Sequence, residues 1–119
     1  MSAPYGEFPL VQITVDVGAA TREYTCQLPF GVRITRSYSA ADAADSTDKY
    51  TATVIYDGNT IKTGTTVVAT DTIYEDIGVD AAYSDFIPAN SPFKVKFTFA
   101  GTATNVKGCR FTLMGAVKR

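Results

Sequence analysis

The chain has 119 residues, of which 45% are hydrophobic and 19% are charged, and its net charge is −1. This length suits one domain with a real core, and the composition excludes intrinsic disorder. Because phosphate binding needs a cationic surplus, the chain as a whole has no electrostatic basis for binding nucleic acid or an anionic membrane.

The N-terminal third predicts three strands. Residues 10–17, 21–30 and 32–38 alternate apolar and polar side chains, which is the period-2 pattern of a half-buried strand. Pro29 has no N–H for a ladder hydrogen bond, so the second strand should end or bend there. Gly31 then allows the third strand to begin.

The middle of the chain predicts a loop and a hairpin. Residues 39–49 are small and polar, which is typical of a long exposed loop. Residues 50–56 and 60–63 flank Asp57-Gly58-Asn59, and an Asp-Gly step between two strand-like runs is a strong hairpin signal.

The C-terminal half predicts short strands and then two longer ones. Residues 65–69 and 72–77 are expected to be short strands, and residues 78–90 a meandering connection. Residues 93–99 alternate apolar and polar side chains without exception. A turn over 100–108 precedes a last strand over 109–117.

About eight short strands, turn signals between them and no amphipathic helix predict an all-β fold. We expect a single-domain antiparallel β-sandwich that is jelly-roll-like, with an immunoglobulin-like sandwich as the alternative. The expected organisation is an N-terminal arm over 1–9 and a sandwich domain over 10–119.

The residue types needed for common catalysis are missing. The chain has no histidine, which removes Ser-His-Asp and Cys-His mechanisms and the usual zinc ligand. It also has no P-loop motif. We therefore predict that the protein is not an enzyme, has no cofactor and has no small-molecule substrate.

The N-terminus lacks the pattern of a secretory signal, and no apolar stretch approaches the roughly 20 residues of a membrane span. The sequence thus predicts a protein made and kept in the cytosol. In that reducing compartment Cys26 and Cys109 are expected to be buried thiols rather than a disulfide.

Carboxylates recur in two places, at Asp42, Asp45 and Asp48 and in an acidic run from Asp71 to Asp85. Calcium prefers oxygen ligands on loops, but neither group fits an EF-hand loop, and Asp is common in exposed turns. We favour solvated loops and predict no metal site.

Charge is uneven along the chain. Residues 86–119 carry six bases and no acid, whereas residues 39–85 are strongly acidic. Opposite charges could interleave on neighbouring strands, or the molecule could have one acidic and one basic face suited to packing in a lattice. The sequence favours the second interpretation slightly.

Seven residues are candidates for contact with a partner. Residues 1–9 are rich in restricted and aromatic residues, so an extended arm that docks on a neighbour is a reasonable hypothesis. Aromatic residues in loops can anchor a partner or stack on sugars, although such residues often only cap the core. The candidates are Pro4, Tyr5, Phe8, Pro9, Tyr74, Tyr83 and Phe86.

Three segments give the chain a family resemblance: residues 28–34 (LPFGVRI), 54–60 (VIYDGNT) and 107–113 (KGCRFTL). In these, and in having neither histidine nor tryptophan, it resembles small bacteriophage capsid decoration (cement) proteins. The resemblance implies a β-sandwich, often a homotrimer, that sits on the capsid exterior of a virion assembled in the host cytoplasm.

Such a protein would bridge neighbouring copies of the major capsid protein. The alternative is a carbohydrate- or receptor-binding module of a phage fibre, and the absence of Trp counts modestly against it because Trp offers the largest stacking face.

Overall fold

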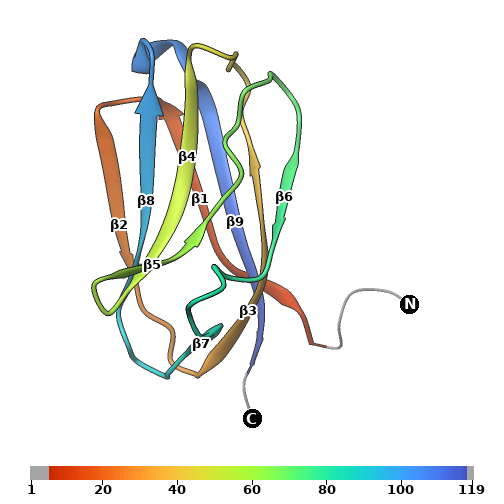
Figure 1. The fold of residues 1–119 in the computed structure, drawn as a ribbon, viewed down its shortest axis with the longest axis vertical. Helices are drawn as coiled ribbons and strands as arrows, with labels where there is room; N and C mark the ends of the chain where they lie inside the picture. Colours follow the sequence, from red (N-terminus) through yellow and green to blue (C-terminus); the bar gives the residue numbers. More distant parts are fainter. Residues whose placement is uncertain (1–5, 118–119) are drawn as a thin grey trace.

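The computed structural model describes residues 6–117, which form nine β-strands and one short 3-10 helix (Figure 1). The elements are β1 (Phe8–Val17), β2 (Thr21–Cys26), β3 (Val32–Ala40), β4 (Lys49–Tyr56), β5 (Asn59–Thr63), β6 (Tyr74–Ile77), β7 (Phe86–Ile87), β8 (Phe93–Ala100), η1 (Ala103–Asn105) and β9 (Lys107–Val117).

The strands form two antiparallel sheets that face each other as a sandwich. One sheet has the order β1-β9-β3-β6, with β7 also pairing with β3, and the other has the order β2-β8-β4-β5. The pairs are nested along the chain, because β1 pairs with β9, β2 with β8, β3 with β6 and β4 with β5. This is a long hairpin rolled into two sheets, so the predicted jelly-roll sandwich is confirmed.

The structure differs from the predicted strands in several places. β2 ends at Cys26, three residues before Pro29. The expected strand over 65–69 makes only one isolated bridge, between Val67 and Tyr50. The expected connection over 78–90 contains β7, whose two residues pair with Val32 and Arg33 of β3. Short strands of this kind depend on a distant partner rather than on local pattern.

The predicted arm over 1–9 needs a correction at its end. Phe8 and Pro9 belong to β1 and lie opposite Gly115 and Met114 of β9. Pro9 is tolerated because it stands at the start of an edge strand, where a missing N–H costs little. Pro4 and Tyr5 lie outside the described residues.

The core lies between the sheets, and the alternation in β8 shows how the sequence builds it. Phe93, Val95 and Phe97 are at most 1% exposed, whereas Lys94 and Thr98 are exposed. The buried positions of one sheet therefore face those of the other. Phe111 and Leu113 of β9 are buried in the same core, together with the inward residues of the neighbouring strands.

Tyr50 of β4 joins the two sheets through this core. Its ring is 1% exposed and stacks on Phe97, with the ring centroids 5.6 Å apart. Its hydroxyl oxygen lies 2.8 Å from the carbonyl oxygen of Ala40 and 2.6 Å from that of Arg110, which are paired residues of β3 and β9. The hydroxyl also accepts a hydrogen bond from the Ala40 N–H. The Tyr50 side chain thus satisfies backbone N–H and C=O groups at the end of the β3–β9 ladder in the opposite sheet.

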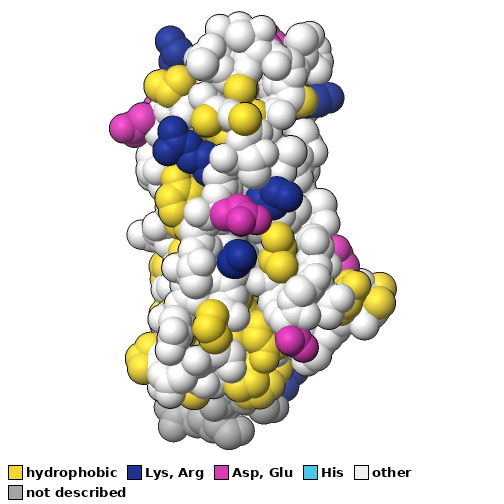
Figure 2. Space-filling model, turned by 90° about the vertical axis from the view of Figure 1, so that its left-hand side faces the viewer, with side chains coloured by type: hydrophobic (Ala, Val, Ile, Leu, Met, Phe, Trp, Pro, Cys, Tyr) yellow, Lys and Arg dark blue, Asp and Glu magenta, His cyan; other side chains and the backbone are white. Residues whose placement is uncertain are grey.

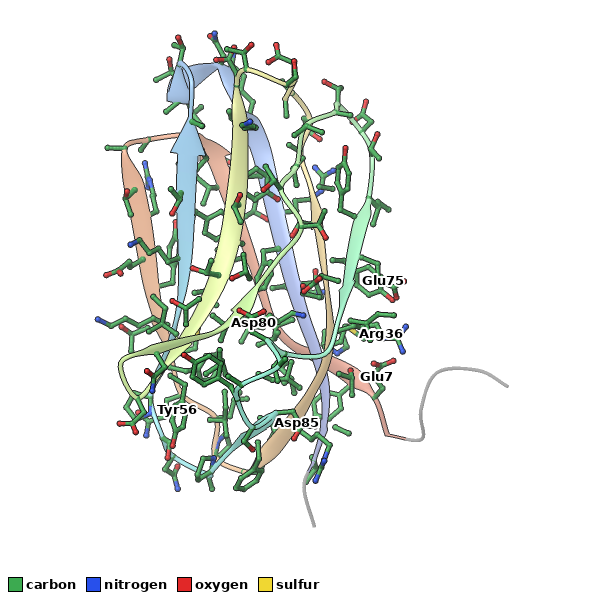
Figure 3. The ribbon with its side chains drawn as sticks, viewed as in Figure 1. Glu7, Arg36, Tyr56, Glu75, Asp80 and Asp85 are labelled. Carbon is green, nitrogen blue, oxygen red and sulfur yellow. The ribbon has the colours of Figure 1, made fainter. Side chains whose placement is uncertain are left out.

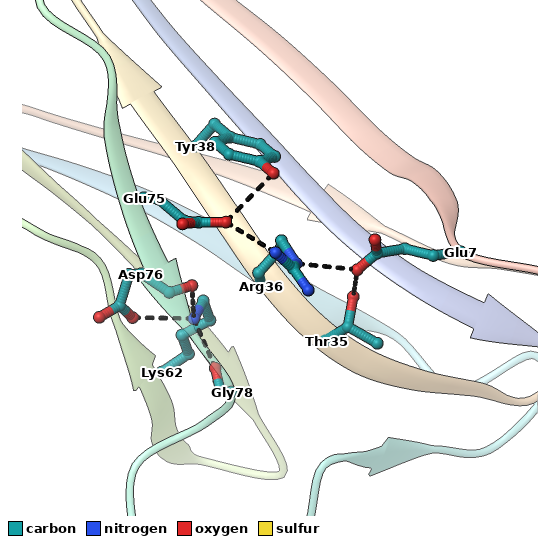
Figure 4. Close-up of polar contacts among 8 residues, drawn as sticks. All are labelled: Glu7, Thr35, Arg36, Tyr38, Lys62, Glu75, Asp76 and Gly78. Carbon is teal, nitrogen blue, oxygen red and sulfur yellow. Dashed lines mark hydrogen bonds and ion pairs between the residues drawn. The ribbon is translucent and has the colours of Figure 1, made fainter. Parts of the chain in front are cut away.

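Lys62 of β5 closes the sandwich on the side of β6. Its side chain is fully buried, and its Nζ donates to the carboxylate of Asp76 at 2.8 Å. The same ammonium donates to the carbonyl oxygens of Asp76 and Gly78 (Figure 4). An ammonium has three donors, so all of them are satisfied. Lys62 therefore links edge strands of different sheets.

The two cysteines are free, with Cys109 buried in β9 and Cys26 half-buried in β2. The two residues belong to opposite sheets. Burial raises the pKa of the Cys109 thiol to about 11 from a usual 9.0, and burial also raises the pKa of Cys26. The neutral thiol is the form that suits these sites.

Stability should fall as the pH rises above about 9. Below that pH both the folded and the unfolded chain keep the Cys109 proton, and between about 9 and 11 only the unfolded chain releases it. The free energy of unfolding should then fall by about 1.4 kcal/mol per pH unit. Urea unfolding at pH 8, 9 and 10 measures this slope. Cys109→Ala should reduce this slope and leave the smaller part that comes from Cys26, and an unchanged slope in that variant would assign the loss to other groups.

Candidate interaction surface

The outward face of β6 carries the most exposed large apolar side chains among residues 6–117. Ile77 is 72% exposed and Ile73, just before the strand, is 71% exposed. β6 pairs with β3 so that Ile77 lies opposite Arg36 and Glu75 opposite Tyr38. Paired residues point to the same side of a sheet, so these side chains share one surface. We call Arg36, Tyr38, Ile73, Glu75 and Ile77 the β6 face.

Charged side chains fix the centre of this face. The Arg36 guanidinium donates to the Glu75 carboxylate at 2.8 Å and to the Glu7 carboxylate at 3.0 Å. The Tyr38 hydroxyl donates to Glu75 at 3.2 Å, and the Thr35 hydroxyl donates to Glu7. Figure 3 shows Glu75, Arg36 and Glu7 along the right-hand side of the molecule, and Figure 4 shows their contacts.

Glu7 reaches this network across a neighbouring strand. Glu7 comes directly before β1, whereas Thr35 and Arg36 belong to β3, and β9 lies between these two strands. Gly115 of β9 lies opposite Phe8, and a Cβ there would stand 2.6 Å from Cδ1 of Leu10 and 2.5 Å from the carbonyl oxygen of Arg33, so the close packing of Leu10 against β9 requires a glycine. The Glu7 side chain is only 3% exposed.

The arrangement suits recognition of another protein surface. The hydrogen bond to Glu75 raises the pKa of the Arg36 guanidinium, so this group stays charged. A held Arg and Tyr beside apolar side chains are the residue types that dominate binding energy at protein interfaces. Because the network is formed within one chain, little side-chain entropy remains to be lost on binding.

The structure does not gather the seven predicted partner residues at one place. Among the five that it describes, only Pro9 and Tyr83 are exposed. Tyr74 is half-buried and packs against the core. Phe8 is half-buried and its ring lies 6.2 Å from that of Phe30. Phe86 is also half-buried, and its ring covers Gly31, where a Cβ would meet it at 3.0 Å.

Sequence reasoning did not select the isoleucines of the β6 face. It predicted a short strand over 72–77 without assigning the side that faces inward, and it sought partner contacts among aromatic residues. The structure decides which side of this segment faces inward, because Tyr74 packs on the core and Asp76 bonds to Lys62. The isoleucines must therefore point the other way.

The carboxylates that could suggest calcium have protein partners. Asp42 pairs with Arg110, Asp85 with Arg33 and Asp76 with Lys62. Asp45 accepts hydrogen bonds from the N–H groups of Asp48 and Thr47, which lower its pKa. Within residues 6–117 no three His, Cys, Asp or Glu side chains are grouped so as to hold a metal ion.

Charges of opposite sign interleave, which differs from the two-faced molecule that the sequence favoured slightly. Arg110 of the basic C-terminal segment pairs with Asp42 of the acidic segment, and Lys96 lies opposite Glu23. Figure 2 shows basic and acidic side chains next to one another on the side of β2. The nested strand pairing brings distant segments together, and this mixes their charges.

No helix in the described part of the chain is long and apolar enough to cross a membrane. No protein-family model matches the sequence, and no curated protein is significantly similar to it.

Solved structures with a related backbone include two from infectious bursal disease virus. The VP2 subviral particle matches at 14% identity and a TM-score of 0.43, over 93% of this chain and 31% of that chain. The Gx strain matches at 12% identity and a TM-score of 0.42, over 94% of this chain and 29% of that chain. This chain spans about a third of the length of each. The likeness is distant, and the fold described above rests on the strand pairing of this chain alone.

Proposed function

We propose that the chain is a non-enzymatic virion structural protein, a decoration protein that binds the outside of a capsid and bridges neighbouring major capsid subunits. The jelly roll supports this proposal, since it is an architecture of viral capsid and lectin domains. The resemblance of the sequence to phage decoration proteins supports it as well. A fold hosts many functions, however, so the β6 face carries the proposal.

The β6 face supports binding because two large apolar side chains there are more than 70% exposed. Burying an isoleucine contributes about 1.5–3 kcal/mol. Ile73 and Ile77 are four strand residues apart, or about 13 Å, and they flank the Arg36 network. A partner that covers both would form an apolar contact around a held charged centre.

Binding to the assembled shell would stabilise it. A ligand that binds only the assembled state adds its binding free energy to the stability of that state. Repeated copies on a lattice increase the total by avidity. The homotrimer implied by the resemblance stays a prediction, as does partner contact by Tyr83 and Pro9, the exposed members of the predicted set.

Replacing Ile77 by lysine should weaken binding to capsids by about tenfold or more, because truncating or charging an interface anchor costs roughly 1.4 kcal/mol or more. The probe is empty shells of the major capsid protein encoded in the same genome, and the measurement is co-sedimentation over a range of protein concentrations. Since Ile77 is 72% exposed, its replacement should leave the melting temperature nearly unchanged.

The matched control is Val17→Lys, at a 43% exposed position on the other edge of the same sheet, which should bind like the wild type. Equal binding by the Ile77 variant, or no binding by the wild type, would contradict the proposal. A glycan array on the same sample tests the fibre-module alternative, because glycan binding without shell binding would support that class instead.

A further inference from the structure

The free edge of β1 differs from the other sheet edges of the described chain. β5 and β6 are covered by hydrogen bonds: Asp80 bonds to Ile61 and Thr63 of β5, and Lys62 bonds to the Asp76 carbonyl of β6. β2 is short and carries the exposed charges Arg22 and Glu23. Covering and charge both discourage the addition of another strand.

β1 lacks such protection over its middle. It is ten residues long and, within residues 6–117, pairs only with β9, on one side. Among its residues the one charged side chain is Asp16, near its end, and its proline stands at position 9. An edge that is long, uncharged and unpaired is a template for strand pairing.

The register of β1 shows which backbone groups are free. The Gly18 N–H donates to the carbonyl oxygen of Val106, so residues of even number in this register bond to β9. In an antiparallel ladder the intervening residues point their N–H and C=O groups away from the partner. These groups belong to Val11 and Ile13, which are half-buried, and to Val15, which is buried. Because Val15 is only 3% exposed, its backbone groups are covered, and the open part of the edge is Val11 to Ile13.

We propose that two copies of this chain pair through β1, antiparallel and about a two-fold axis at Gln12. Val11 of one copy then lies opposite Ile13 of the other, and their free N–H and C=O groups satisfy one another. The half-buried Val11 and Ile13 side chains cover each other across the new ladder. The pairing joins the five-stranded sheets of the two copies into one continuous sheet.

The surface chemistry at this edge is self-complementary, which is what a two-fold contact requires. On the outer face Gln12 meets the Gln12 of the second copy, and an amide carries both donors and an acceptor. Thr14, the next exposed residue along the strand, is uncharged as well, so no charge faces a like charge, and Leu10 lies at the β1 bulge and packs against the core. With a net charge of −1 for each chain, long-range repulsion between copies is small.

This pairing is independent of shell binding, and it differs from the threefold assembly that the resemblance implies. Sedimentation velocity of the full chain from about 1 to 500 µM covers the usual range of weak interfaces. We expect a mass twice 12.8 kDa at the upper end of this range. A monomer throughout, or a mass three times that of the chain, would overturn the proposal.

Gln12→Lys places two like charges on the axis and should weaken the dimer at least about tenfold while the fold is kept, because Gln12 is exposed. The matched control is Thr21→Lys, an exposed position on the edge strand β2, which should leave the dimer unchanged. A dimer that persists in Gln12→Lys would place the contact elsewhere.

Hydrogen exchange gives a second readout at the bonds themselves. In the wild type the N–H groups of Val11 and Ile13 should exchange at least about tenfold more slowly at high than at low concentration. The N–H groups of Gln12 and Thr14 bond to β9, so in the wild type they should be protected at both concentrations. The Thr14 N–H should stay protected in the Gln12→Lys variant as well. Val11 and Ile13 that exchange rapidly in a sample of dimeric mass would refute pairing through β1.

Discussion

Replacing Tyr50 by alanine should lower the free energy of unfolding by about 4 kcal/mol, the cost typical of deleting a buried aromatic ring. The ring is 1% exposed and lies 5.6 Å from Phe97 and 6.1 Å from Phe99, centroid to centroid. Its removal opens a cavity at the centre of the sandwich and also leaves the backbone of Ala40 without its partner. Urea unfolding measures the change.

Tyr50→Phe separates the two contributions. It keeps the ring and removes only the hydroxyl, so the expected loss is about 1–2 kcal/mol. Tyr83→Ala is the control, because Tyr83 is 40% exposed and packs less. If Tyr50→Phe and Tyr50→Ala cost the same, or if neither costs more than the control, Tyr50 does not join the sheets as described.

Replacing Lys62 by methionine should lower the free energy of unfolding by about 3 kcal/mol, or roughly 12 °C in melting temperature. Methionine fills a similar volume but donates nothing. The Asp76 carboxylate and the carbonyl oxygens of Asp76 and Gly78 would then lose a fully buried donor. Because the Asp76 side chain is 33% exposed, water recovers part of the loss, which keeps the estimate at the lower end for a broken buried pair.

Lys94→Met on β8 is the matched control, since Lys94 is exposed, and it should change the stability by less than about 0.5 kcal/mol. Adding Asp76→Asn to Lys62→Met should restore part of the stability by removing the uncompensated charge. Thermal unfolding of all three variants decides the point. Lys62→Met that melts with the wild type would mean that the ammonium does not hold β5 and β6 together.

The sequence was a good guide where a segment defines its own structure. The strict alternation of residues 93–99 became β8, and the Asp57-Gly58 step became the turn between β4 and β5. Both signals are local, because one depends on the pleat and the other on backbone angles that Gly58 adopts at φ 79°. The β-sandwich class followed from counting such segments, which left the choice between a jelly roll and an immunoglobulin-like arrangement open.

The sequence was a poor guide where structure depends on a distant partner. β7 exists because β3 offers its edge to Phe86 and Ile87. Lys62 is buried although lysine is rarely buried. Its hydrogen-bond partners Asp76 and Gly78 lie 14 and 16 residues away, in and just after β6 of the other sheet. The Arg36 network joins Glu7, 29 residues away, across β9. No period in the sequence reports contacts of this kind.

The candidate site was missed for a related reason. Aromatic residues in expected loops were taken as the partner surface, but Tyr74 and Phe86 are half-buried and pack locally. The exposed apolar side chains are aliphatic, and they lie on a strand whose inward face is decided by Lys62 and the core. Orientation at a sheet edge is set by register, and register is a tertiary property.

The most direct test of the proposed function is hydrogen exchange of the chain bound to empty shells, compared with the free chain at the same concentration. We predict slower exchange on binding in β6 and in the segment of β3 that carries Arg36 and Tyr38, with little change in β2 and β8. Slowing confined to β2 and β8, or no slowing at β6 in a sample that sediments with the shells, would contradict binding through the β6 face.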